Sequence, residues 1–208
     1  MHFLITAGPT REYLDPVRFL SNASSGKMGY ACAASAVRRG HQVTLISGPA
    51  VCTKPAGVKV IPVVTCREMR RAVMQVYPKC DCVIMTAAVS DYRPKHRSKT
   101  KIKSKQLGQR VELERTEDIL AELGQAKKGQ ILIGFALEDK APRQRALKKM
   151  AAKRLDIVVL NQPAAIGADT IDAQMTRPGG KWQRYDHITK KRLATFLVKQ
   201  AEQLTRTK

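Results

Sequence analysis

Short apolar runs alternate with amphipathic helical patterns along most of this 208-residue chain. The first run, HFLIT, ends in Ala-Gly-Pro, and a helical pattern then begins near Gly29 and closes with Arg-Arg-Gly. A strand–helix–strand rhythm indicates right-handed crossovers between parallel strands, so it predicts an α/β fold with a doubly wound, mainly parallel sheet and helices on both faces. We expect six strands, at residues 2–6, 41–46, 58–64, 82–88, 130–135 and 157–160, and later helices at 67–77, 117–126, 141–155 and 190–204.

Two segments interrupt this rhythm. Residues 93–114 are polar, very basic and weakly periodic, and residues 164–184 have the composition of loops, with room for a short hairpin. Within the first segment, a strand would send Lys99, Lys101, Lys103 and Lys105 to one face, and a solvated basic loop is the other interpretation. There is no repeat or linker, so we expect a single domain over residues 1–208.

The net charge of +21 is the extreme feature of the composition. It is compatible with nucleic-acid binding, with an enzyme for polyanionic substrates, or with a basic surface that serves only solubility. Only 5% of the residues are aromatic and no stacking motif is visible, which favours non-specific contact with nucleic acid at most. No apolar run approaches the roughly 20 residues of a membrane span, and the start MHFLITAGPT does not resemble a signal peptide, so we expect no membrane contact and a cytoplasmic protein.

The carboxyl ends of three predicted strands carry the residues where a ligand is expected in such a sheet: Ala7-Gly8-Pro9, Ala87 to Asp91, and Gly134-Phe135. Asp91, just past a strand, suits Mg²⁺, a ribose hydroxyl or the capping of a turn. The loop SNASSGKMG at residues 21–29 matches neither a Walker loop nor Gly-x-Gly-x-x-Gly. It predicts either anion binding by backbone N–H groups at a helix starting near Gly26, or plain capping by Ser24 or Ser25.

The helix predicted at residues 143–155 has two kinds of stripe. Leu147, Met150, Ala151 and Leu155 recur at the spacing of a core face. Arg145, Lys149 and Lys153 form a basic row at i, i+4 and i+8, and such rows are usually solvated faces.

Taken together, these stretches resemble a known family. ITAGPTREYLDPVRFLSNASSGKMGYA (Ile5 to Ala31), followed in order by AAVSDYRP, KIK, GFALE and KKMAAKRLDIVVLNQ, is similar to phosphopantothenoylcysteine synthetase of the bacterial type, as a stand-alone domain. The resemblance implies a Rossmann-like fold and a ligase of coenzyme A biosynthesis. In that reaction the carboxylate of 4′-phosphopantothenate attacks the α-phosphate of CTP, releasing pyrophosphate, and L-cysteine then displaces CMP from the acyl-CMP intermediate. Mg²⁺ is implied; ATP serves the eukaryotic type, and no flavin is expected in this domain.

The same resemblance implies roles for particular residues. Asn22 and Arg18 would hold the acyl group beside Ala88, and Lys101 would steady the triphosphate. The backbone at Ser24, Ser25 and Gly26 would meet the phosphate of phosphopantothenate. The implied nucleotide-binding residues are Gly8, Ala87, Asp91 (also the Mg²⁺ position), Lys101, Thr116, Glu117, Phe135, Lys149 and Lys153.

Partners are also implied: a homodimer in which the segment at about 93–114 pairs across the interface or closes as a flap, and a separate phosphopantothenoylcysteine decarboxylase. The chain departs from the family at Arg115-Thr116-Glu117-Asp118-Ile119, where Lys-Asn-Pro-Asp-Ile is usual, and at Leu160-Asn161-Gln162, where Ala-Asn-Asp is usual. The first departure bears on the preference for CTP. The alternative classes are a basic nucleic-acid-binding α/β module and a nucleotide-dependent reductase. The glycine fingerprint of such reductases is absent from this sequence.

Overall fold

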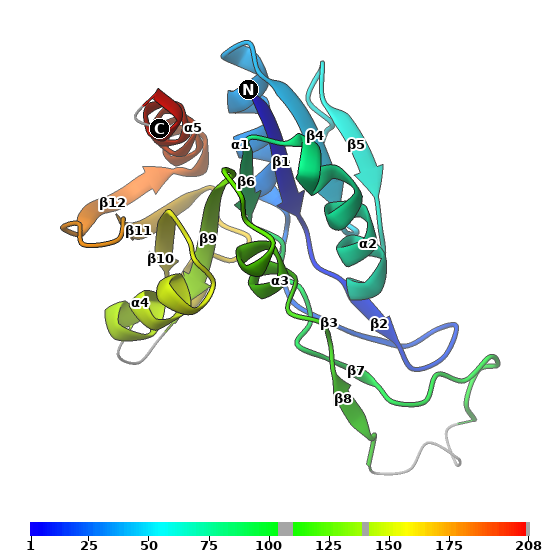
Figure 1. Cartoon of the computed structure of the whole chain (residues 1–208). Helices are drawn as coiled ribbons and strands as arrows, with labels where there is room; N and C mark the ends of the chain where they lie inside the picture. The colour runs from blue at the N-terminus through cyan, green and yellow to red at the C-terminus, as the bar shows by residue number, and fades with distance from the viewer. Residues whose placement is uncertain (104–109, 139–141, 207–208) are drawn as a thin grey trace.

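The computed structural model describes residues 1–103, 110–138 and 142–206, and its centre is an eight-stranded sheet with the order β12–β11–β10–β9–β6–β1–β4–β5 (Figure 1). Six of these strands run parallel, as the pairings of β1 with β4 and β6, of β4 with β5, and of β9 with β6 and β10 define. They are β1 (His2–Ala7), β4 (Gln42–Ser47), β5 (Lys59–Pro62), β6 (Cys82–Met85), β9 (Ile131–Leu137) and β10 (Ile157–Asn161).

The six parallel strands are those predicted from the sequence, but the prediction of a six-stranded sheet is wrong. A hairpin of β11 (Thr170–Thr176) and β12 (Gln183–Thr189) adds two antiparallel strands beside β10. The hairpin joins the sheet because Ile171, Ala173 and Met175 alternate along β11 and are buried in the core. That alternation lies in the segment whose composition indicated loops.

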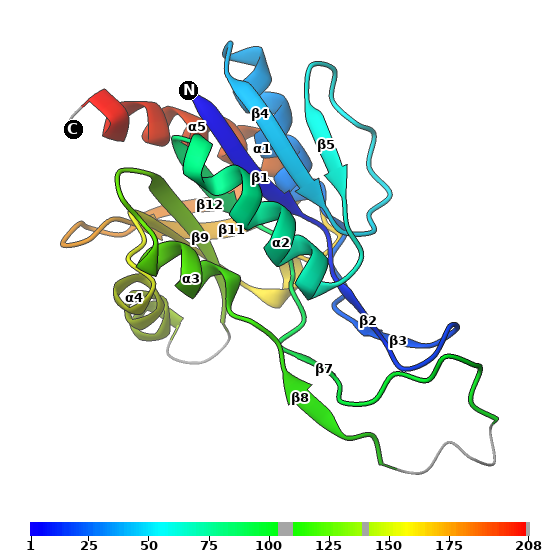
Figure 2. The same cartoon turned by 45° about the vertical axis from the view of Figure 1, so that its right-hand side comes forward.

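Helices cover both faces of the sheet, as expected (Figures 1 and 2). On one face, α1 (Lys27–Arg38) packs beside α5 (Lys190–Arg206) over a core of apolar residues from β1, β4, β9 and β10. The other face carries α2 (Cys66–Val76), α3 (Ile119–Gln125) and α4 (Pro142–Ala152) over a second core. Two 3₁₀ turns connect these elements: η1 (Tyr77–Lys79) lies between α2 and β6, and η2 (Pro163–Ala165) lies between β10 and β11. No helix in the described ranges is both long enough and apolar enough to cross a membrane.

A slender arm projects from the sheet beyond the carboxyl ends of the strands (Figure 2). It consists of the paired strands β2 (Arg11–Tyr13) and β3 (Phe19–Ser21), the paired strands β7 (Tyr92–Pro94) and β8 (Leu113–Arg115), and the described residues between each pair. The prediction of a row of lysines on one strand face is not borne out for Lys99 to Lys103, which belong to no strand; Ser104 and Lys105 lie outside the described residues.

Candidate active site

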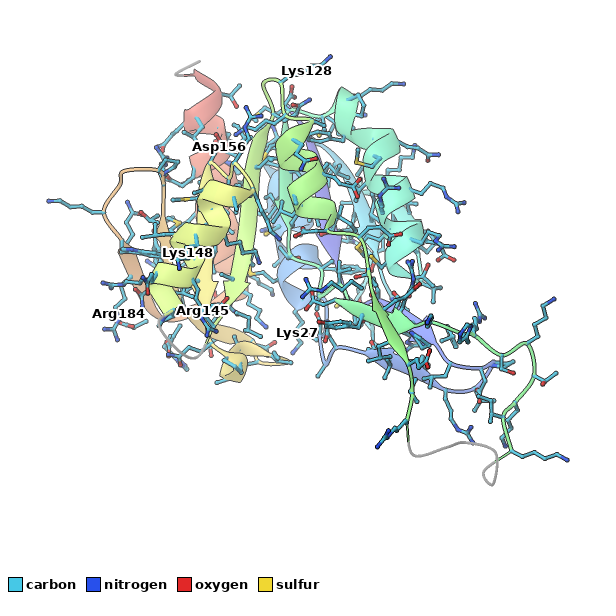
Figure 3. The ribbon with its side chains drawn as sticks, turned by 60° about the horizontal axis from the view of Figure 1, so that its bottom comes forward. Lys27, Lys128, Arg145, Lys148, Asp156 and Arg184 are labelled. Carbon is cyan, nitrogen blue, oxygen red and sulfur yellow. The ribbon has the colours of Figure 1, made fainter. Side chains whose placement is uncertain are left out.

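A cleft of about 810 Å³ opens at the carboxyl ends of the parallel strands, the edge at which the sequence predicts ligand binding. Its lining comes from the loop before α1, the ends of β6, β9 and β10, the start of α3, α4, and the segment from η2 to α5. In Figure 3, Lys27 and Arg145 lie toward this edge, whereas Lys128 and Asp156 lie toward the opposite end of the strands. Twelve of the predicted site residues line it: Asn22, Ser24, Ser25, Gly26, Ala87, Ala88, Asp91, Thr116, Glu117, Phe135, Lys149 and Lys153.

The SNASSGKMG loop reaches the cleft because α1 approaches the sheet very closely. A Cβ on Gly29 would lie 2.5 Å from the Cβ of Ala7 and 2.6 Å from Oγ1 of Thr86, so only glycine fits there. Gly26 is the N-cap of α1 with φ +78°, and the cap has no side-chain hydrogen bond. The alternative of plain capping by Ser24 or Ser25 is therefore wrong: their hydroxyls accept only the local N–H groups of Gly26 and Lys27.

Asn22 joins this loop to the segment that follows β6. Its Nδ2 donates to the carbonyl oxygens of Ala88 and Val89, each at 3.2 Å. The Ala88 amide in turn donates to the Gly8 carbonyl at 3.0 Å, which extends the pairing of β1 and β6 past their ends. The amide group of Asn22 thus fixes the distance between two walls of the cleft and leaves its own carbonyl oxygen for a ligand.

Asp91 and Thr116 meet where the arm leaves the sheet. The Thr116 hydroxyl donates to the Ser90 carbonyl at 2.6 Å, and its amide donates to the Asp91 carbonyl at 3.0 Å. These bonds fix the backbone of Ser90 and Asp91. The Asp91 carboxylate is exposed and lines the cleft, and within the described residues no hydrogen bond or ion pair occupies it. Glu117 beside them receives two hydrogen bonds from Arg93. Burial acts to raise the pKa of Glu117, but its own amide and Arg93 outweigh that effect and lower the pKa.

One side of the cleft is formed by Lys149 of α4 and Lys153, which directly follows the last residue of this helix; we call them the α4 pair. Lys153 forms an ion pair with Asp118, at 2.7 Å, while Asp118 also caps α3 through the Ala121 amide. Lys149 donates instead to the carbonyl oxygen of Phe135 at 2.6 Å. Burial, and then the nearby charge of Lys153, lower the pKa of Lys149.

The core-facing side of α4 differs from the predicted one. The core face consists of Ala146 and Met150, whereas Leu147 is 41% exposed and Ala151 is also exposed. Positions 146 and 150 face the core while Lys149 donates to Phe135 of β9, so the predicted stripe through Leu147 and Ala151 turns toward solvent. Leu155, just past the helix, is buried as predicted.

The opposite side of the cleft holds two lysines that the sequence did not assign to a site, Lys27 and Lys190, which we call the α1–α5 pair. Lys27 donates to the Gly167 carbonyl at 2.8 Å and pairs with Asp169 at 2.7 Å. Lys190, only 8% exposed, donates to the Ala165 carbonyl at 2.8 Å. Burial, and then Lys27, lower the pKa of Lys190. Lys190 directly follows β12, so the hairpin β11–β12 places it at the cleft. No local pattern in the sequence predicts this position.

Three predicted site residues do not line the cleft. Gly8 is buried with φ +74°, against the backbone of Gly48. Arg18 and Lys101 lie together on the arm: Arg18 Nη1 donates to the carbonyl of Ile102 at 3.1 Å and to the buried Asp15 at 3.1 Å. The structure therefore separates the predicted catalytic residues into Asn22 in the cleft and Arg18 with Lys101 outside it.

The described residues contain no group of three or more histidine, cysteine or acidic side chains able to hold a metal ion. A bound Mg²⁺ commonly uses one or two carboxylates together with the phosphates of a nucleotide. The free carboxylate of Asp91 suits that arrangement, in which the nucleotide brings most of the ligands.

Comparison with known proteins gives the family. Residues 1–204 match the family described as DNA/pantothenate metabolism flavoprotein C-terminal domain. The coenzyme A biosynthesis bifunctional protein CoaBC of Bacillus subtilis (strain 168) is 52% identical over 168 residues, which cover 80% of this chain and 41% of that protein. The chain thus spans less than half the length of this curated relative.

Solved structures agree. The crystal structure of the C-terminal domain of a CoaBC protein is 42% identical, covers 100% of this chain and 96% of that chain, and superposes with a TM-score of 0.87. A structure named as Cab2 mutant H337A in complex with phosphopantothenate-cysteine shares the fold, with a TM-score of 0.81 at 15% identity over 99% of this chain and 88% of that chain. The family resemblance inferred from the sequence motifs is confirmed: the chain belongs to the family of the C-terminal domain of the coenzyme A biosynthesis protein CoaBC.

Proposed function

We propose that this chain is a single-domain cytoplasmic ligase that joins 4′-phosphopantothenate to L-cysteine through an acyl-nucleotidylate. The observation that carries the proposal is that one cleft joins the Asn22 loop, a free carboxylate at Asp91 and lysines from both faces of the sheet. Both proposed co-substrates are polyanions, so cations on two sides match the charge that the cleft must hold. Membership of the CoaBC family supports the same pathway.

The first step forms a bond between a carboxylate oxygen of phosphopantothenate and the α-phosphorus of the nucleotide, and breaks the bond to pyrophosphate. We assign Lys149 and Lys153 to the charge of the nucleotide. Fixed cations preorganise the site for a phosphoryl group because they need no rearrangement when charge shifts to the leaving group. Mg²⁺ at Asp91 would supply further neutralisation of the phosphates.

In the second step the amine of cysteine attacks the acyl carbon and forms the C–N bond of the amide. The bond between this carbon and the oxygen of the nucleotide phosphate breaks, its electron pair leaves on that oxygen with the nucleoside monophosphate, and the proton of the amine passes to the leaving phosphate or to water. Asn22 positions the walls around this carbon through its bonds to Ala88 and Val89. In this reading the Asn22 amide acts chiefly by holding the acyl pocket, and a donation to the acyl oxygen requires it to exchange one of these carbonyl partners.

CTP is the nucleotide that we propose. Support comes from the family's bacterial members and from Phe135, whose side chain lines the cleft where a base can stack. The pocket wall at Arg115 to Ile119 differs from the usual sequence, so the nucleotide test below is an essential part of the proposal.

The decisive experiment incubates the protein with 4′-phosphopantothenate, L-cysteine and Mg²⁺, with CTP or ATP given separately, and measures pyrophosphate. We expect release with CTP and an amide product of the corresponding mass. Omission of cysteine should limit release to a single turnover, because the acyl-nucleotidylate then remains bound. No release with either nucleotide overturns the ligase proposal, and release with ATP alone overturns only the choice of CTP.

We further propose that the arm forms a homodimer and carries Arg18 and Lys101 to the partner's cleft. Two facts support this: both residues lie outside the cleft of their own chain, and apolar residues are exposed on the arm. The exposed apolar side chains are Val17, Phe19, Tyr92, Val111 and Leu113. Such exposure is characteristic of surfaces that are covered by a partner.

Mixing two inactive variants tests the dimer. If Arg18→Ala and Asn22→Asp disable the same site from different chains, an equimolar mixture should regain about a quarter of wild-type turnover, since half of the random dimers contain one intact site. No regain, with a dimer present by light scattering, overturns the exchange across the interface. A monomer by light scattering overturns the dimer itself. We also propose a phosphopantothenoylcysteine decarboxylase as a partner of this domain, testable by co-purification.

A further inference from the structure

The α1–α5 pair has the same construction as the α4 pair. Each pair contains one lysine with a carboxylate partner, Lys27 with Asp169 and Lys153 with Asp118. Each also contains one lysine, Lys190 or Lys149, whose hydrogen bond within the described residues goes to a backbone carbonyl. The two pairs project from helices on opposite faces of the sheet into one cleft.

Lys190 is the residue that most demands a counter-ion. It is 8% exposed, and in the part of the chain that the structure describes it forms no ion pair. An ammonium has three N–H donors, and a buried one without an anion is costly. Asp169 does not neutralise this side strongly, because its side chain is 87% exposed and bonded to Lys27. An anionic ligand in the cleft would supply the missing charge.

The surroundings specify what kind of anion fits. Lys190 and Lys27 donate to the carbonyls of Ala165 and Gly167, which flank Ile166 in the chain. Ile166 lines the cleft and is 45% exposed, with Met28 and Ile171 also in the lining. Two cations beside an apolar surface suit a phosphate monoester with a branched alkyl group next to it, rather than a nucleotide, which would need a planar surface for its base.

On the basis of the proposed ligase function, we propose that Lys27 and Lys190 bind the phosphate of 4′-phosphopantothenate, and that Ile166 packs on the dimethyl carbon next to the phosphoester methylene. Lys190 is then the residue by which the protein selects phosphopantothenate over pantothenate. The local geometry supports the same position, since Ser25 and Gly26 of the SNASSGKMG loop line the cleft together with Lys27 and Lys190, and the Cys52 thiol donates to the carbonyl of Ser25 at 3.3 Å. The loop and the lysine pair thus face one volume.

The test compares two ligands that differ only in the phosphate. Lys190→Gln should lower kcat/KM for 4′-phosphopantothenate by about tenfold to a hundredfold, the loss expected for a charge-assisted hydrogen bond, with pantothenate and CTP changed by about twofold at most. Lys27→Gln should act in the same direction by a smaller factor, because Lys27 already has an anionic partner. Lys191→Gln, an exposed neighbour with the same charge change, is the matched control and should leave both ligands unaffected.

Calorimetric titration of each variant with 4′-phosphopantothenate and with pantothenate gives the same comparison without turnover. An equal loss for both ligands in Lys190→Gln and Lys27→Gln means that the lysines only hold the segment at Ala165 to Gly167, and overturns the inference. If the wild-type protein makes no product yet binds the phosphorylated ligand better, with the preference lost in Lys190→Gln, the ligase proposal fails and this site stands. Lys190→Arg, which keeps a cation, should retain part of the preference.

Discussion

The two sides of the cleft hold the same arrangement of charges, built from very different parts of the chain. The α4 pair comes from one continuous stretch, with Lys149 in α4 and Lys153 directly after its last residue, and both members appear in the sequence as a regular basic row. The α1–α5 pair comes from the start of two helices that are distant in sequence and meet only because they pack side by side on one face. Two similar lysine pairs can therefore differ in whether the sequence reveals them: the α4 pair forms a local pattern, and the α1–α5 pair does not.

The difference also concerns the carboxylates. Asp118 is held by its role as the cap of α3, and its partner Lys153 is mostly buried. Asp169 has no such anchor and is largely exposed, as its partner Lys27 is in part. We infer that Lys153 is fixed in place before a ligand binds, whereas Lys27 can leave Asp169 at small cost. The predictions below test how far the two sides are alike.

The largest effect is expected at Asn22, which links the loop on one side of the cleft to the segment after β6. In Asn22→Asp a carboxylate would face the carbonyl oxygens of Ala88 and Val89, cannot donate to them, and should repel them. Turnover should fall by about a hundredfold to a thousandfold, as for other lost oriented donors, while the fold is kept. Steady-state kinetics and a thermal melt check this. Normal turnover would remove Asn22 from the mechanism, and Asn22→Ala separates the loss of the donor from the added charge.

Next in size is Lys149→Met, which breaks the α4 side alone. Because this lysine lacks a carboxylate partner, we expect KM for CTP to rise by about tenfold or more and KM for 4′-phosphopantothenate to change little. Kinetics with each substrate varied in turn make the measurement. Lys148→Met, at the exposed neighbouring position labelled in Figure 3, is the control. If KM for both substrates rises equally, the division of the cleft into two ends is wrong.

A smaller effect concerns how firmly the α1–α5 side is fixed. Glu202 of α5 accepts hydrogen bonds from Arg39 at 2.8 and 2.6 Å and contacts His41 at 2.7 Å. Hydrogen bonding to Arg39 is the main cause that lowers the pKa of Glu202 from 4.5 to about 2. A lowered pKa of an acid stabilises the folded state above the ordinary pKa, so this stability is complete above about pH 4.5 and is lost as the pH falls toward 2.

Urea unfolding at several pH values measures this contribution. We expect Glu202→Gln to remove a stability difference on the order of 1 kcal/mol between these limits, a figure that allows for solvent screening of a surface pair. An unchanged pH dependence in Glu202→Gln would show that other acids determine the acid sensitivity of the protein.

The smallest effects are expected for the two carboxylates that face the lysine pairs. Asp169→Asn should leave the free energy of unfolding almost unchanged, because exposed ion pairs contribute little. Asp118→Asn should cost more, up to about 1 kcal/mol, since Lys153 is more buried, although asparagine still caps α3. Urea unfolding of both variants orders them. The reverse order would contradict the contrast between a fixed and a loosely held lysine.

The parallel part of the fold was predictable because each of its strands is a compact apolar run and each crossover helix has its own periodic pattern. The sequence allowed a short hairpin at residues 164–184 but did not predict that β11 and β12 extend the central sheet, since β11 alternates small and large apolar residues with polar ones and β12 is mostly exposed at the sheet edge. The face that α4 presents was mispredicted at Leu147 because the helix packs against the core through Ala146 and Met150, and this orientation depends on tertiary packing rather than on the local pattern.

The site was predictable wherever its residues follow a strand end or share a helix. Asn22, Asp91 and Lys149 belong to this group, and the structure brings them to one cleft. Lys190 was not assigned to the site because its place in the cleft depends on its burial beside η2, which the local sequence does not reveal. Arg18 and Lys101 match positions of the family motif, but neither lines the cleft. The spacing of residues along the sequence does not predict this separation.

Asp15 on the arm has a consequence for motion. Its side chain is completely buried and accepts hydrogen bonds from the amides of Val17, Arg18 and Ile102, in addition to the guanidinium of Arg18. Neither the turn before β3 nor the stretch around Ile102 can open to water without leaving this carboxylate short of donors. The two stretches should therefore exchange their amide hydrogens as one cooperative unit, so that Arg18 and Lys101 are ordered together or released together.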